Sequence, residues 1–312
     1  MYLIWAEYLS DATPLRKVVE DSVVELLKYI NIAVGDDVVA SLRRVRDISS
    51  GLGAEVMDAI LRNIEVGRSE GRPVCQDTGL VVVKVVIGDE FPLKLGELRS
   101  SIIKGITRAT EEVPLRPNAI DSITGMNTGS NVGEKAPWIV VEPTEGDVLE
   151  LGIMVKGGGS EAACRALAVP PVRGLRAAAN LVVDVIVEYG FNTCPPLFVG
   201  VGLGGTVATA AEIAYEALFR PVGVRHWSRE IAEFEEYLLE LLNKLDVGPG
   251  GLGGGPTVID VHIETAAHHP ASMGVAVAVN CWALRRGKVR IYPDGTTEFF
   301  KYSLGGGVWI RW

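Results

Sequence analysis

The chain has 312 residues, of which 48% are hydrophobic, so it can bury a sizeable core and is too apolar to be disordered as a whole. Its formal net charge of −9 argues against a nucleic-acid-binding protein, because neutralising phosphates needs clustered Lys and Arg. The first ten residues lack a basic lead and a long apolar run, and no apolar stretch reaches membrane-spanning length. We therefore expect no signal peptide, no membrane span and a cytoplasmic location.

The first third of the chain has the pattern of helices. Thr13 followed by Pro14 predicts a helix start, because Thr is a favoured N-cap and Pro fits the first helical position. Apolar residues spaced over 19–30 then form one helical face. A second short helix is expected after Asp36, and a third over 51–66 that ends at Gly67.

From residue 80 onward, strands and helices alternate. Runs of β-branched and apolar residues predict strands at 80–87, 138–141, 148–155, 197–202, 257–264 and 273–282. Helical periodicity predicts helices at 97–112, 174–189, 206–219 and 226–245. Turn residues at 293–295 predict a hairpin over 288–300. The mixture predicts an α+β fold, with mixed β-sheets flanked by helices and a helical N-terminal region.

Three of the four cysteines stand beside residues that are typical of turns and binding sites. Cys75 opens Cys75-Gln76-Asp77-Thr78-Gly79, Cys194 opens Cys194-Pro195-Pro196, and Cys281 follows the apolar run 275–280. Long stretches separate them, so only the fold can bring them together. The fourth, Cys164, is expected in a helix. Taken singly, each cysteine is most simply a small buried apolar residue, since four in 312 do not make a disulfide framework.

Three loop thiols together suggest two kinds of inorganic centre. Structural zinc prefers four protein ligands, and the local C-x₂-C pairs of zinc ribbons are absent from the sequence. A [4Fe–4S] cluster held by three thiolates leaves one iron without a protein sulfur. That iron can act as a Lewis acid on a substrate oxygen.

Two glycine-rich stretches follow a predicted strand and precede a predicted helix: Gly157-Gly158-Gly159-Ser160 and residues 200–206. Such loops present backbone N–H groups to an anion, or else form tight turns that need positive φ. A third stretch, 248–256, could be a hinge or a ligand loop. Arg116, in a polar segment after the helix at 97–112, could clamp a carboxylate or stay solvated at the surface.

Two further residues are candidates for proton transfer. His269, in His268-His269-Pro270 after the strand at 257–264, has a side chain whose pKa lies near neutrality. The alternative is a structural histidine with satisfied hydrogen bonds. Asp77, beside a thiol, is a charged group of the kind found in catalytic pockets, or it caps the turn at Thr78-Gly79.

Read together, these segments make the chain similar to the α subunits of class I iron–sulfur fumarate hydratases and L-tartrate dehydratases, which are two-subunit hydro-lyases. Residues 75–79 resemble the first cluster motif of that family, and residues 127–129 and 156–161 resemble its glycine-rich substrate segment. Residues 194–206 resemble the second cluster motif, and 269–286 the third. The likeness runs from about residue 14 to about residue 300, in the family's order.

The resemblance implies a single iron–sulfur hydro-lyase α-subunit domain over 1–312, helical over about 1–70 and cluster-binding over about 71–312. It implies that a [4Fe–4S] cluster is bound by three cysteines, namely Cys75, Cys194 and Cys281. It also implies that Gln76, Asp77, Arg116, the glycines Gly157, Gly158 and Gly159, and His269 line a dicarboxylate site, with Asp77 and His269 as the catalytic residues.

The resemblance also implies partners and a reaction. The single-chain members carry a further C-terminal domain, so we expect a separate β subunit to complete the site in an α2β2 assembly. The expected reaction is reversible hydration of fumarate to malate. The alternatives are L-tartrate dehydration, mesaconate hydration and, from another class, a non-catalytic module that binds an anion or zinc.

The chain departs from the family pattern at a few positions. Pro256 stands where the family usually has Lys, and Leu284 stands where Asp is common. The stretch 162–165, which contains Cys164, is less polar than the family pattern. The first two could alter substrate preference or local packing, and neither touches the three loop cysteines.

Overall fold

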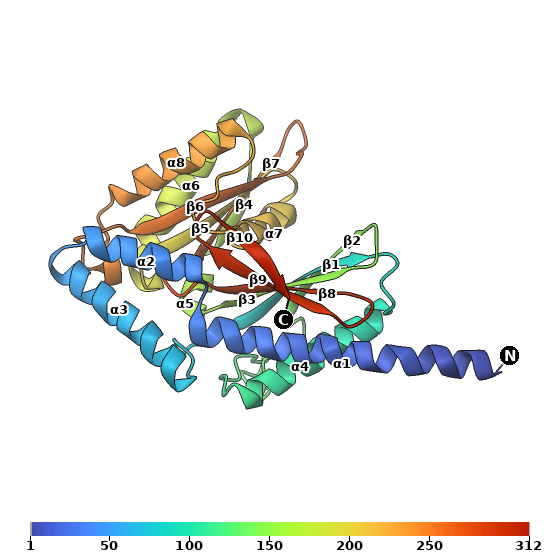
Figure 1. Cartoon of the computed structure of the whole chain (residues 1–312). Coiled ribbons are helices and arrows are strands. Elements are labelled where there is room, and N and C mark those ends of the chain that lie inside the picture. The colour runs from blue at the N-terminus through green and yellow to red at the C-terminus, as the bar shows by residue number, and fades with distance from the viewer. Residues whose placement is uncertain (1, 312) are drawn as a thin grey trace.

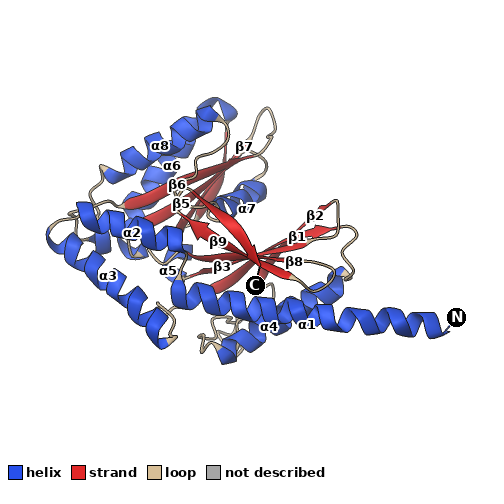
Figure 2. Cartoon of the chain, in the orientation of Figure 1, coloured by secondary structure: helices blue, strands red, loops and turns tan. Residues whose placement is uncertain are grey.

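The computed structural model describes the backbone of residues 2–311 and the side chains of residues 14–311. Its described strands form two sheets, one six-stranded and one four-stranded, with helices against them (Figures 1 and 2). The helical N-terminal region consists of α1 (Tyr2–Ala33), α2 (Asp36–Ile48) and α3 (Gly51–Glu70). The expected α+β class is therefore confirmed.

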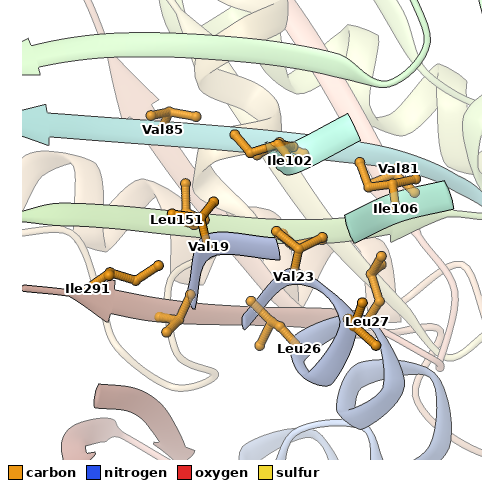
Figure 3. Packing of buried hydrophobic residues seen from close by; sticks show 14 of the residues in the cluster. Val19, Val23, Leu26, Leu27, Val81, Val85, Ile102, Ile106, Leu151 and Ile291 are labelled. Atoms are coloured by element: carbon orange, nitrogen blue, oxygen red, sulfur yellow. The ribbon is translucent and has the colours of Figure 1, made fainter. Parts of the chain in front are cut away.

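The first sheet has the strand order β10-β9-β8-β3-β1-β2. Its strands are β1 (Leu80–Gly88), β2 (Trp138–Thr144), β3 (Leu149–Lys156), β8 (Arg285–Ile291), β9 (Thr297–Ser303) and β10 (Gly306–Arg311). Only β1 and β2 pair in parallel among these neighbours. Two helices, α1 and α4 (Leu95–Glu112), cover one face with apolar side chains, and Val19 of α1 and Ile106 of α4 share a core there with Val81 of β1 and Leu151 of β3 (Figure 3). Burying this face drives formation of the sheet, because β-branched residues suit a pleated, covered surface.

The second sheet has the order β4-β7-β5-β6. Its strands are β4 (Arg165–Val169), β5 (Leu197–Leu203), β6 (Val258–Thr265) and β7 (Met273–Asn280). Helices α6 (Gly174–Tyr189) and α8 (Arg229–Asn243) contribute to the core on one face. Helix α7 (Val207–Ala217) packs on the other face, in a core shared with α2 and α3. Alternate residues of β5 and β7 serve the two cores, as the two-residue period of a strand requires.

Two glycines of β5 allow α7 to pack directly on the strand backbone. A Cβ atom at Gly200 would lie 2.1 Å from the carbonyl oxygen of Ala214, and one at Gly202 would lie 1.9 Å from that of Ala210. The first half of the glycine-rich stretch 200–206 therefore lies in the strand expected over 197–202, and only its second half can form a turn. Gly200 and Gly202 are buried strand residues, and only Gly204 and Gly205 lie after the strand.

The structure corrects the expected ends of two helices. Helix α1 begins at Tyr2 and contains Pro14, because one missing N–H does not stop a helix that continues on both sides. The side chain of Thr13, the expected N-cap, lies outside the described residues. Helix α3 continues past Gly67 to Glu70 and ends at Gly71, whose φ of 66° suits a left-handed C-cap.

Three short elements connect the larger ones: the 3₁₀ turns η1 (Pro171–Arg173), η2 (Gly190–Thr193) and η3 (Pro249–Gly251). The five-residue helix α5 (Gly158–Ala162) follows β3. Cys164 lies between α5 and β4, so its expected helical placement is wrong. None of the described helices is both long and apolar enough to cross a membrane.

Candidate functional site

The Cys75 loop links α3 to β1 and is fixed by its aspartate. Oδ1 of Asp77 accepts a hydrogen bond from the Gly79 N–H (3.0 Å), and Oδ2 accepts one from the Gly158 N–H (2.7 Å). The first bond is the turn cap expected as the alternative for Asp77, and the second ties the loop to the glycine-rich stretch. Cys75 and Asp77 are half-buried, and Gln76 is exposed.

The glycine-rich loop begins where β3 ends and leads into α5. A Cβ atom at Gly157 would lie 2.9 Å from Oδ2 of Asp77, so a side chain there would displace the carboxylate. The Gly158 N–H is already engaged by Asp77 and is not a free donor. Ser160 at the end of the loop accepts a hydrogen bond from the backbone N–H of Cys281 (3.2 Å). The loop therefore lies between the Cys75 and Cys281 segments.

The antiparallel pairing of β5 and β7 brings the other two cysteines together. Cys194 precedes β5 and Cys281 follows β7, and these two strand ends are neighbours in the sheet. The Trp282 N–H donates to the Cys194 carbonyl oxygen (3.3 Å). Cys194 is exposed and has a φ of 53°, in the left-handed region that non-glycine residues seldom occupy. Backbone strain of this kind is often found at functional sites.

The three loop thiols influence one another electrostatically. Burial raises the pKa of the Cys194 thiol, and the nearby Cys281 and Cys75 thiols raise it further. Each thiolate therefore makes the next one harder to form unless positive charge compensates. Within the described residues, no three Cys, His, Asp or Glu side chains form a group that could hold a metal ion. The thiols thus gather in one region without the geometry of a closed single-ion site.

Arg116 lies beside the Cys75 loop. Its backbone N–H donates to the Thr78 hydroxyl (2.9 Å), and the neighbouring Asn118 side chain donates to the Gly79 carbonyl (3.1 Å). The Arg116 side chain is exposed. The segment that follows α4 is therefore held against residues 78–79, and it carries the exposed Arg116.

The loop at 248–256 supports the Cys194 loop from behind. The Gly250 N–H donates to the Pro195 carbonyl (2.9 Å). A Cβ atom at Gly53, in the first turn of α3, would lie 2.4 Å from the Gly253 carbonyl oxygen. These close backbone contacts explain the glycines of this stretch by packing.

His269 lies at the other end of the second sheet. It occupies the loop between β6 and β7, where it is exposed, and its Nδ1 accepts from the Ala271 N–H (3.1 Å). The whole of β7 separates this loop from Cys281, which corresponds to about 25 Å of extended strand. The chain therefore brings Cys75, Asp77, Cys194 and Cys281 into one region, together with Arg116 and the glycine loop, and leaves His269 outside it.

Sequence reasoning gave no role to two residues that the structure places at the site. Ser160 joins the glycine loop to Cys281, and Arg285 donates from Nη1 to the Asp77 carbonyl (2.8 Å). The available signal for Arg285 was an arginine pair, Arg285-Arg286, at the start of a strand whose Val289 and Ile291 belong to the apolar core.

A cavity lies away from the cysteine loops. A cavity of about 530 Å³ lies between α1 and the β9–β10 hairpin, and no cysteine lines it. Its walls, which include Leu26, Tyr29 and Ile310, are mostly apolar. Charged residues such as Lys28, Asp36 and Arg68 also line it, but the thiols and the glycine-rich loop do not, so the chemistry of this chain is better sought at the cysteine loops.

Three thiols, a carboxylate and a glycine-rich loop thus lie in one region of an α+β chain. Comparison with known proteins then gives the family. A family model described as fumarate hydratase (Fumerase) matches residues 20–290, so the chain belongs to the fumarate hydratase family. The resemblance drawn from the motifs is confirmed.

The similar proteins include bacterial and archaeal α subunits. The chain is 38% identical over 283 residues to the L(+)-tartrate dehydratase subunit alpha of Escherichia coli K12, which covers 90% of this chain and 93% of that protein. It is 38% identical over 280 residues to a putative L(+)-tartrate dehydratase subunit alpha of Methanocaldococcus jannaschii, which covers 88% of this chain and 98% of that protein.

Proposed function

We propose that the chain is the α subunit of a hydro-lyase that adds water to a C4 dicarboxylate or removes it, with hydration of fumarate to malate as the first candidate. The observation that carries the proposal is the meeting of the Cys75, Cys194 and Cys281 loops beside Asp77. Family membership and the names of the relatives support the reaction class.

The donor set fits a [4Fe–4S] cluster better than a single zinc ion. Three thiols are available and no fourth protein ligand joins them among the described residues, whereas structural zinc takes four. A cluster binds its thiolates at separate iron corners, so they need not converge on one point. The positive charge of the irons would also offset the burial and the mutual repulsion of the thiolates, which both raise the pKa of Cys194. When bound, such a cluster supplies a Lewis-acidic iron without protein sulfur, able to polarise the substrate hydroxyl.

The residues of this chain would bind the substrate and move its proton. Arg116, exposed beside the Cys75 loop, can take one substrate carboxylate bidentately. Gln76 is exposed next to it and offers an amide donor. The Gly157 and Gly159 amides can stabilise the charge that develops when the carbon next to a carboxylate loses its proton, whereas Gly158 acts through Asp77.

Asp77 is the proton carrier that this chain itself supplies. Its carboxylate is half-buried and held in place by two backbone N–H groups, so its direction toward the site is fixed. His269 stays a candidate for the second catalytic group, but the length of β7 means that it would have to come from another copy of the chain. A neighbouring α subunit in the proposed α2β2 assembly could provide it.

A separate β subunit is proposed to complete the site. Gln76 and Cys194 are exposed, and the cysteine loops lie on an open face, so this chain alone excludes little water. The relatives are named as alpha subunits, which supports a partner. The cytoplasm is the proposed location, since all four cysteines are free thiols and a reducing compartment keeps them so.

Dehydration of L-tartrate is the second candidate, favoured by the names of both relatives. Fumarate hydration and tartrate dehydration have the same requirements. Each needs groups that bind the two substrate carboxylates, a side chain that transfers a proton, and a centre that polarises the hydroxyl. The choice among fumarate, L-tartrate and mesaconate depends on one or two pocket side chains. Some of these lie on the β subunit.

The test is to reconstitute the α–β pair anaerobically with iron and sulfide. Consumption of fumarate is followed by ultraviolet absorbance, and L-tartrate and mesaconate are assayed in parallel by chromatography of the products. Acid-labile sulfide is measured on the same sample. We expect a brown complex with turnover on at least one of the three acids. A cluster-loaded complex inert on all three would defeat the hydro-lyase proposal, and a stable chain holding one zinc would favour the binding module.

A further inference from the structure

Two adjacent arginines begin β8, and both are buried, but only one has a carboxylate partner. Arg286 is fully buried, and its Nη2 lies 2.6 Å from Oδ2 of the equally buried Asp37. Its guanidinium also lies 4.2 Å from the centre of the Tyr302 ring. Arg286 is therefore an ordinary structural ion pair that joins α2 to the first sheet.

Arg285 is 1% exposed and makes no ion pair with any described residue within 4 Å. Its Nη1 donates to the Asp77 carbonyl oxygen (2.8 Å) and to the Asn31 side-chain oxygen (3.3 Å), and both acceptors are neutral. Its Nε is buried and has no hydrogen-bond partner among the described residues, which is also true of Nε and Nη1 of Arg286, so the missing ion pair is what distinguishes Arg285. Neighbouring strand residues point to opposite faces, so Arg285 cannot share the carboxylate that serves Arg286.

A buried cation without a counter-charge is costly, because desolvation is not repaid by attraction. Arg285 cannot lose its proton to avoid this cost, since a guanidinium stays charged in proteins. A fully buried arginine without an ion-pair partner therefore points to a further negative group at the site.

The position of Arg285 identifies where that negative charge belongs. A Cβ atom at Gly157 would lie 3.7 Å from Nη2 of Arg285 and 2.9 Å from Oδ2 of Asp77, so the guanidinium lies directly behind the glycine loop. The Asp77 carboxylate lies close by but forms no ion pair with Arg285, and its two oxygens accept hydrogen bonds from the amides of Gly79 and Gly158. Arg285 thus faces the region where the thiols gather.

We propose that Arg285 is the buried counter-charge of the cysteine site. It compensates the negative charge of three thiolates and their cluster, and it positions the Cys75 loop through the Asp77 carbonyl. The proposal rests on the proposed function, because the anionic group that it names is the thiolate-bound cluster. It makes Arg285 a positioning and electrostatic residue, which touches neither substrate nor iron.

The proposal predicts that cluster-free and cluster-loaded chains respond in opposite ways to loss of this charge. In the cluster-free chain, Arg285→Gln removes an uncompensated charge, so the urea midpoint of unfolding stays unchanged or rises. The matched variant Arg286→Gln leaves the buried Asp37 carboxylate without its ion-pair partner, so the urea midpoint of unfolding falls. If Arg286→Gln does not fold, Arg286→Lys, which keeps the charge, provides the comparison.

In the reconstituted chain, Arg285→Gln is expected to lose iron and sulfide faster under dilute chelator and to shift the cluster reduction potential to more negative values. A nearby positive charge stabilises the reduced cluster, whose net charge is more negative. Arg285→Lys keeps the charge and restores most of the potential. Arg290→Gln removes the same unit charge from the same strand, but at a half-exposed pair with Glu150, and leaves the potential unchanged.

The outcomes separate this inference from the proposed function. If the unaltered chain binds no iron–sulfur cluster, the proposed function fails, and the cluster-free unfolding series still tells whether Arg285 lacks a counter-charge. If the unaltered complex is active but Arg285→Gln keeps the same potential and the same cluster retention, the inference fails by itself. It fails as well if Arg285→Gln lowers the cluster-free midpoint as much as Arg286→Gln does.

Discussion

Asp77→Asn tests the candidate site most directly, because its structural and chemical costs can be estimated separately. Both Asp77 oxygens accept backbone N–H bonds, at 3.0 Å from Gly79 and 2.7 Å from Gly158. Asn keeps one oxygen, so one bond is lost. Gly79 is buried and Gly158 is exposed. The side-chain oxygen of Asn should therefore keep the hydrogen bond from the Gly79 N–H, and water should replace it at the Gly158 N–H. The loss is about 1.5 kcal/mol, the low end for a hydrogen bond to a charged group.

The chemical cost should be far larger. If Asp77 carries the proton, its amide cannot, and turnover should fall by about 10²- to 10⁴-fold. Urea unfolding of the α chain and fumarate absorbance of the reconstituted complex measure the two effects. Asp294→Asn is the matched control, since Asp294 caps the β8–β9 turn by accepting the Thr296 N–H (2.8 Å) and lies far from the cysteines in the fold. Near-normal turnover of Asp77→Asn with a full cluster would refute the assigned role.

Three further predictions address packing, acid stability and the second catalytic group. Gly202→Ala should destabilise the chain by about 3 kcal/mol in urea, because its Cβ meets a helix carbonyl, whereas Gly96→Ala meets open space and should not destabilise it. The pKa of Asp260 is about 2 because, although burial raises it, hydrogen bonds and neighbouring basic side chains lower it more. Ionised Asp260 therefore contributes about 2 kcal/mol to the free energy of unfolding above pH ~4, and this contribution is lost as the pH falls toward 2. In Asp260→Asn, the free energy of unfolding should fall less steeply as the pH is lowered through this range. Co-expression of Asp77→Asn and His269→Gln chains should restore about a quarter of the active sites if His269 acts in a second copy, because half of the dimers are mixed and one of their two sites has both residues. No site should be restored if His269 acts within its own chain.

The sequence predicts most elements of the fold but not their arrangement. Continuous β-branched runs gave strands such as β1 because such residues suit a covered sheet. Two strands were missed for a shared reason. β4 is five residues long and β10 contains two glycines, and each lies at a sheet edge with little apolar burial to mark it. Edge strands are defined by the partner they pair with, and that partner is not encoded locally.

The site shows the same limit. The sequence motifs identify Cys75, Cys194 and His269 equally as candidate site residues. Only the strand topology decides which of them are neighbours in the fold. Antiparallel pairing of β5 with β7 places Cys194 beside the residue that follows β7, namely Cys281. The same pairing sends the residues before β7, including His269, to the opposite end of the sheet. The motif over 269–286 thus places His269 at one end of the sheet and Cys281 at the other.

The position of the site between the two sheets explains why a glycine loop and a buried lysine flank it. The Cys75 loop leads into the first sheet, whereas Cys194 and Cys281 belong to the second. Lys156, the last residue of β3, is 1% exposed at its side chain, and its Nζ donates to the Val279 carbonyl of β7. The hydrogen bond of Lys156 therefore joins the end of β3 in the first sheet to β7 in the second. The glycine loop follows directly after this lysine. Because the three sulfurs come from both sheets, their spacing depends on this connection, and a shared cluster would in turn hold the two sheets together.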